Sequence, residues 1–115
     1  MKSEKLRERV IFEKRMTLAD PGDGAGTYRA DWVEQFERWA SVTNLIGGET
    51  VIAARLSGIQ PCVITVRMDS ETKLIKADWR ARHKVSGDIY NLRAPNPAPD
   101  RSQISFMAET GEASG

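Results

Sequence analysis

The residue types that could carry catalysis or bind a metal are few in this chain. There is one cysteine, Cys62, and one histidine, His83. A nucleophilic Cys/His pair could use only these two, and they cannot by themselves build a zinc site of Cys/His ligands. Cys62 stands in an apolar, β-branched run, where a buried and unreactive thiol is the usual state. We therefore predict no catalysis, no metal and no cofactor.

The glycine-rich segment 20–26 has the acidic character of a calcium loop but lacks its pattern. Pro21 and Gly22 stand where such a loop needs a free backbone and a ligand, and Asp31 replaces its bidentate glutamate. The segment also lacks the Lys-Ser/Thr pair, the preceding strand and the following helix of a phosphate-binding loop. We interpret it as a mobile loop.

One arrangement of cations could have a function. Arg80, Arg82 and Lys84 alternate with apolar residues and His83 in a predicted strand. A period of two places the three cations in a row on one face. Such a row could attract nucleic-acid phosphates, because each contact releases a counterion. A solvated strand face is the alternative.

Four aromatic residues, Trp32, Phe36, Trp39 and Trp79, could in principle stack on nucleic-acid bases. A small domain needs large side chains in its core. We therefore expect these aromatics to pack inside the protein.

The length and composition predict a single domain, 1–115, with an ordered core at about 6–109. The chain has 115 residues, 40% of them hydrophobic and 29% charged, and a mean hydropathy of -0.46. These values are typical of a soluble globular protein. No segment has the length of an apolar membrane span, and the start of the chain lacks the apolar region of a secretory signal. We expect a cytoplasmic protein with no membrane partner.

The charges are banded along a nearly neutral chain. Residues 1–15 carry six positive and three negative charges, 16–60 three and six, 61–94 seven and four, and 95–115 one and three. The bands are therefore +3, -3, +3 and -2. Such banding could give a small domain two faces of opposite sign, which suits head-to-tail contact between copies, or it could produce a mixed, solvated surface.

The hydrophobic pattern predicts mostly short strands. Period-two or β-branched runs predict strands at 6–16, 62–68, 79–85, 89–93 and 103–109, with 79–85 and 89–93 forming a hairpin through Ser86-Gly87-Asp88. Residues 32–45 begin with helix-like spacing and continue as a strand, so both interpretations stay open there.

Other segments interrupt the strands. A helix is expected at 49–56, closed by Gly58, an extended loop at 96–100 and a frayed tail at 110–115. Together these elements predict a mainly β fold, a small antiparallel β-barrel or sandwich with one short helix and long mobile loops.

Several short motifs also stand in a characteristic order from about Leu6 to Glu109. They are the run 6–13, the glycine-bearing loop with Trp32, the segments 39–42, 47–49 and 53–54, the strand end 65–67, and the segments 87–90 and 100–101. Their order and spacing resemble the head-tail joining, or head-closure, proteins of long-tailed bacteriophages, which include stopper and head-tail adaptor proteins. The chain departs from that family at Pro61-Cys62, at Asp88 and at 106–109.

The resemblance implies a structural virion protein with no enzymatic reaction. Such a barrel would form a ring below the portal, join the DNA-filled capsid to the tail and help to retain the genome. Its partners would be copies of itself, portal or adaptor ring proteins, a tail-completion or tail-terminator protein, and double-stranded DNA in the channel. It would be located in the virion connector, and in the host cytoplasm during assembly.

The resemblance also implies site residues. Segments 20–26 and 44–58 would make assembly contacts or line the channel, and Arg80, Arg82 and Lys84 would face DNA. The candidate assembly residues are Asp20, Gly22, Asp23, Gly24, Gly26, Gly47, Gly48 and Glu49. A stand-alone small β-barrel that binds nucleic acid is the alternative function, supported by the same cations and by the tryptophans.

Overall fold

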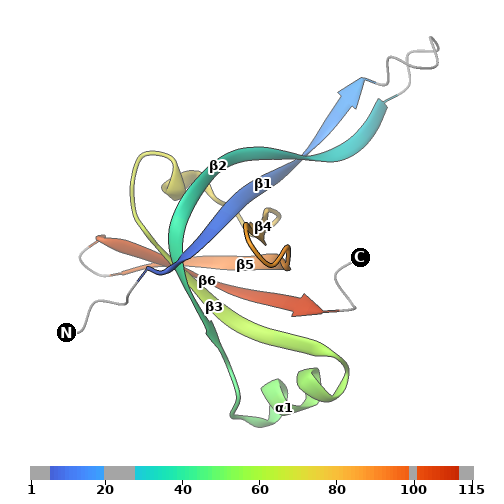
Figure 1. The fold of residues 1–115 in the computed structure, drawn as a ribbon, viewed down its shortest axis with the longest axis vertical. Helices are drawn as coiled ribbons and strands as arrows, with labels where there is room; N and C mark the ends of the chain where they lie inside the picture. The colour runs from blue at the N-terminus through green and yellow to red at the C-terminus, as the bar shows by residue number, and fades with distance from the viewer. Residues whose placement is uncertain (1–5, 20–27, 99–100, 112–115) are drawn as a thin grey trace.

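Six antiparallel strands close into a barrel in the computed structural model, which describes residues 6–19, 28–98 and 101–111 (Figure 1). Around the barrel the order is β1-β2-β3-β6-β5-β4. The elements are β1 (Glu8–Ala19), β2 (Tyr28–Asn44), α1 (Glu49–Leu56), β3 (Ile59–Arg67), a 3-10 turn (Thr72–Leu74), β4 (Arg80–His83), β5 (Ile89–Pro97) and β6 (Gln103–Gly111). This mainly β architecture confirms the predicted fold class.

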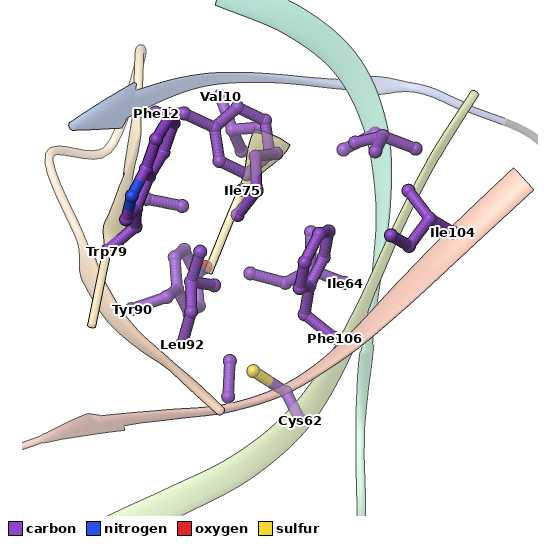
Figure 2. Packing of buried hydrophobic residues seen from close by; sticks show 14 residues of the cluster. Val10, Phe12, Cys62, Ile64, Ile75, Trp79, Tyr90, Leu92, Ile104 and Phe106 are labelled. Atoms are coloured by element: carbon purple, nitrogen blue, oxygen red, sulfur yellow. The ribbon is translucent and has the colours of Figure 1, made fainter. Parts of the chain in front are cut away.

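The core lies inside the barrel, where alternate residues of each strand point inward (Figure 2). The Phe12 ring centroid lies 5.5 Å from that of Phe36 and 6.3 Å from that of Phe106. Ile75 and Trp79 join this cluster from the connection between β3 and β4. The other buried members are Val10, Ala40, Cys62, Ile64, Val66, Ala81, Tyr90, Leu92, Ile104 and Ala108.

The segment with two open interpretations is a single strand, β2. Its register against β1 shifts between Phe12 and Glu13: Phe36 pairs with Phe12, whereas Glu34 pairs with Glu13. The unpaired Gln35 between them is a β-bulge, and the extra residue breaks the period of two. The spacing of apolar residues around the bulge therefore imitates a helix.

Helix α1 has the predicted bounds, and the predicted glycine follows it. Gly58 has a φ of +85° and its N–H donates to the Arg55 carbonyl. Glycine adopts this left-handed conformation without the steric cost that a Cβ brings. The local sequence therefore determines where this helix ends.

The β4–β5 hairpin is confirmed, but β4 ends earlier and β5 later than predicted. Val85 is 87% exposed and lies in the turn, so the alternation of β4 stops at His83. Strand β5 includes Pro95 and Pro97, which were expected near or within a loop. The Ala98 N–H donates to the Gln103 carbonyl of β6, so the backbone groups of Ala98 and Asn96 point toward β6. The nitrogens of Pro95 and Pro97 therefore point to the opposite side, where β4 has already ended and no N–H is needed.

The hairpin of β1 and β2 is longer than the barrel. β1 pairs with β4 only over Val10–Glu13, and β2 pairs with β3 only from Ala40 onward. Residues 14–19 of β1 and 28–35 of β2 form a two-stranded extension that projects from the barrel (Figure 1), here called the projecting ribbon. The predicted loop at 20–26 lies outside the described residues, whereas β6 extends through Thr110 and Gly111 into the segment expected to be frayed.

Candidate functional site

The predicted basic row is present on the outside of the barrel, but each of its cations has an acidic partner. Arg80 Nε lies 2.6 Å from Glu13 Oε1, and Arg82 reaches both Glu13 and, at 2.6 Å, Glu34. The ion pairs on this surface form two groups, here together called the ion-pair cluster: Glu13 and Glu34 with Arg80 and Arg82, and Glu37 with Arg9 and Lys84. Three glutamates thus pair with four cations, the three of the row and Arg9.

Glu13 is the most buried member of the ion-pair cluster. It is 5% exposed, and its two carboxylate oxygens accept from Arg80 and Arg82. A carboxylate in this position holds both guanidinium groups against the barrel wall. Glu13 was recognisable as an alternating residue of its strand, but its role depends on the pairing of β1 with β4.

Glu37 is the shared carboxylate of the second group of the ion-pair cluster. It pairs with Arg9 and lies 3.3 Å from Lys84 Nζ. The hydrogen bond from Arg9, assisted by Lys84, lowers the pKa of Glu37 even though desolvation opposes the shift. The carboxylate is therefore ionised at neutral pH and compensates the charge of Lys84.

The aromatic residues divide between the core and the surface. Trp79 is buried and Phe36 packs against the core, as expected. Trp39 was wrongly placed in the core: it is 51% exposed, because it lies on the outer face of β2, and Arg9 Cζ lies 4.6 Å from its ring centroid. Trp32 also lies outside the core cluster, with Arg80 Cζ 4.5 Å from its ring centroid. The exposed tryptophan faces are therefore covered in part by arginine.

The segment between β2 and β3 presents apolar side chains to solvent. Ile46 is 70% exposed and Leu56 85%, and none of the residues of α1 is buried. Gly47, Gly48 and the first helical residue, Glu49, are exposed. The predicted assembly segment 44–58 thus combines a short helix with unpacked apolar groups. The other predicted assembly segment, 20–26, is outside the described residues.

The two potential nucleophilic groups are not brought together by the fold. Cys62 is fully buried on β3, and burial, with a further effect of Glu109, raises its pKa to about 11. His83 is on β4, where its Nε2 lies 3.2 Å from Glu8 and its Nδ1 accepts backbone N–H groups of the following turn. Strands β3 and β4 are not neighbours in the barrel. The hydrogen bonds of His83 thus order the turn after β4. The Cys62 thiol, with its raised pKa, is protonated at neutral pH.

Among the described residues, no cluster of three or more His, Cys, Asp or Glu side chains could hold a metal ion. In the same part of the chain, no helix is both long and apolar enough to cross a membrane.

Comparison with known proteins decides the family. The sequence model of the phage head completion proteins matches residues 1–111. The chain belongs to this family. The structural head protein expected from the sequence is thereby confirmed at this level, and the chain is a component of virion assembly.

Two solved structures have a similar fold. A chain from the virion of a native gene transfer agent particle is 23% identical, with a TM-score of 0.67, over 97% of this chain and 100% of the other. Protein SF1141 from Shigella flexneri 2a is 20% identical, with a TM-score of 0.70, over the full length of both chains. No curated protein sequence matches the chain. The structural likenesses extend the family's fold to distant sequences.

Proposed function

We propose that this head completion protein forms a ring in the head-tail connector, joins the capsid and portal to the tail, and helps to retain the genome. Family membership over residues 1–111 is the observation that carries the proposal. The role is structural and involves no enzymatic reaction. The buried, protonated Cys62 agrees with this view.

Segment 44–58 is proposed to contact a neighbouring ring or to line the channel. Its support is the exposure of Ile46, Ile52 and Leu56. Apolar side chains left in water do not stabilise a monomer, whereas contact with a partner would bury them. Gly47 and Gly48 have open space where a Cβ would stand, so the backbone of this segment leaves room for an approaching partner. Substitution of Leu56 by Asp should impair assembly without unfolding the exposed helix.

The row Arg80, Arg82 and Lys84 remains a candidate for facing DNA within such a ring. Its glutamate partners reduce the attraction of one copy for phosphate, because a cation that already has a carboxylate partner releases fewer counterions. Several copies around one duplex would add their weak contacts. Weak binding by the free chain is therefore what this proposal requires.

The alternative, a stand-alone nucleic-acid-binding barrel, predicts that the free chain binds DNA strongly. Three phosphate contacts would give measurable affinity at low salt, with a log-log salt slope on the order of -3. The ion pairs of Glu13, Glu34 and Glu37 with this row disfavour that behaviour. Submicromolar binding by the free chain with a slope near -3 would support the alternative and contradict the ring proposal.

Particles made without the chain provide the direct test. They should package DNA, then lose it and fail to join tails, and the wild-type chain supplied in trans should restore tailed particles. Electron microscopy of restored particles should place this barrel as a ring between portal and tail. Stable, tailed particles without the chain would contradict the proposal.

A further inference from the structure

The projecting ribbon has two strand edges that no other strand pairs with among the described residues. We infer that these edges join neighbouring copies: the β1 edge at 14–19 of one copy pairs with the β2 edge at 28–35 of the next. This inference rests on the proposed ring and names the surface that would hold its subunits together.

The direction of the β1 backbone supports this pairing. Lys84 N–H donates to the Arg9 carbonyl, so Arg9 and the residues two apart from it direct their backbone groups toward β4. β4 pairs with β1 only as far as Glu13. The next residues with the same direction, Arg15 and Thr17, therefore direct their N–H and C=O groups to the side where β4 has ended.

The β2 edge shows a similar feature. The backbone N–H of Trp32 donates to the side chain of its neighbour Asp31, at 2.8 Å, and not to a strand. A local side-chain acceptor of this kind satisfies an edge donor until a strand replaces it. A two-stranded ribbon without a third strand is also only marginally stable in water. A strand added at this edge would therefore stabilise the ribbon more than a strand added against the closed barrel would stabilise the barrel.

Charge favours a second copy as the occupant. The edge at 14–19 carries Lys14 and Arg15 and no acidic residue, whereas the edge at 28–35 carries Asp31 and Glu34 against Arg29. The two edges thus have charges of +2 and -1. Glu34 already pairs with Arg82, so the attraction between copies supplements the backbone bonds and does not replace them.

Symmetry also suits this arrangement. The two edges differ, so their contact is head-to-tail and repeats around a ring. All ribbons of a cyclic ring point the same way along its axis, and β1 and β2 run in opposite directions within each ribbon. β1 of one copy would therefore meet β2 of the next antiparallel, as in β-strand addition.

Amide hydrogen exchange tests the edge. In the free chain, the Arg15 and Thr17 amides should exchange fast, whereas the Lys14 and Met16 amides, which point toward β2, should be protected. In assembled particles, all four should be protected. Protection of Arg15 and Thr17 to the same degree in the free chain, or fast exchange of both in the particle, would overturn the inference.

Thr17→Pro tests the function of the edge, with Thr17→Ala as the matched control. Proline removes the outward N–H and places its ring at the edge, but leaves the backbone bonds of Lys14 and Met16 to β2, so the hairpin should fold. The number of closed, tailed particles should fall about tenfold or more. Thr17→Ala keeps the N–H and should assemble normally. Circular dichroism and thermal unfolding of both variants check the fold.

A photo-crosslinker at position 17 identifies the occupant. It should link to 28–35 of a second copy in wild-type-like particles. A link to another virion protein, or normal numbers of particles with Thr17→Pro, would overturn the inference and leave the proposed ring standing. Absence of the wild-type chain from particles would instead overturn the proposed function, and the inference with it.

Discussion

Strands β1 and β2 lie in two different settings within one molecule. In the barrel, three successive β1 residues are buried: Val10 and Phe12 belong to the core cluster, and Ile11, which points to the opposite face, is only 8% exposed. A few residues later, Lys14 and Met16 are exposed in the projecting ribbon. The same hairpin is therefore part of a closed wall at one end and an open two-stranded arm at the other. β1 and β2 pair with each other in both settings, so the difference arises from the further strands, β4 and β3, that pair with them only in the barrel.

The ion-pair cluster lies at the boundary between these settings. Glu13 is the last β1 residue that pairs with β4, and it holds Arg80 and Arg82. Arg80 in turn lies over Trp32 of the projecting ribbon. The ion pairs thus connect the arm to the barrel and occupy cations that are candidates for facing DNA.

Truncation in the core should give the largest contrast between the two settings. Phe12→Ala removes a fully buried ring that packs against Phe36 and Phe106, and should lower the free energy of unfolding by about 3–5 kcal/mol. Met16→Ala in the ribbon should change it by less than about 0.5 kcal/mol. Urea unfolding measures both. Equal losses would mean that the arm is packed as tightly as the barrel.

Removal of the buried carboxylate charge should have the next largest effect. Glu13→Gln leaves Arg80 and Arg82 beside a neutral group, and should cost about 2–3 kcal/mol of unfolding free energy. Glu109→Gln is the matched control, because its partner Arg93 is exposed and such pairs contribute about 0–1 kcal/mol. A cost for Glu13→Gln no larger than that of the control would show that the cluster does not fasten β4 to β1.

The connection between β3 and β4 should respond to acid. Burial alone would raise the pKa of Asp69, but hydrogen bonds from Arg38 and from the Thr72 and Glu71 amides lower it from 3.8 to about 2. The folded state therefore favours the ionised form, so this stabilisation is present above about pH 4 and is lost as the pH falls through about 2.

Asp69→Asn should accordingly lower the melting temperature at pH 7 and flatten its decline between about pH 4 and pH 2. The shift should be modest, since the carboxyl is partly exposed. Asp78→Asn, at an exposed position in the same connection, serves as the control. An unchanged acid profile for Asp69→Asn would rule out this carboxylate as an acid-sensitive contact.

The reactivity of a thiol compares the barrel with the projecting ribbon without a change in the stability of the protein. Burial raises the pKa of Cys62 to about 11, so the native thiol should be alkylated at pH 8 roughly 100-fold or more slowly than an ordinary exposed cysteine. A cysteine at position 17, introduced by Thr17→Cys, should react at the ordinary rate in the free chain. Similar rates for both thiols would indicate frequent opening of the barrel.

The sequence by itself determined the local structure. The period of two located the strands and their inward faces, as in Val10 and Phe12, and glycine chemistry located the end of α1 at Gly58. The ordered motifs also indicated the family that the comparison then established. These features depend on neighbours along the chain, so they can be read without knowing the fold.

Only the tertiary structure decided which groups meet. Three features depend on the register of strands that are far apart in sequence. They are the bulge at Gln35, the exposure of Trp39 beneath Arg9, and the position of Glu13 between two arginines. Barrel closure also decided where β1 loses its third strand and becomes a projecting edge. Residue types and their period give the face of a strand, but its partners come from long-range pairing, which no local pattern contains.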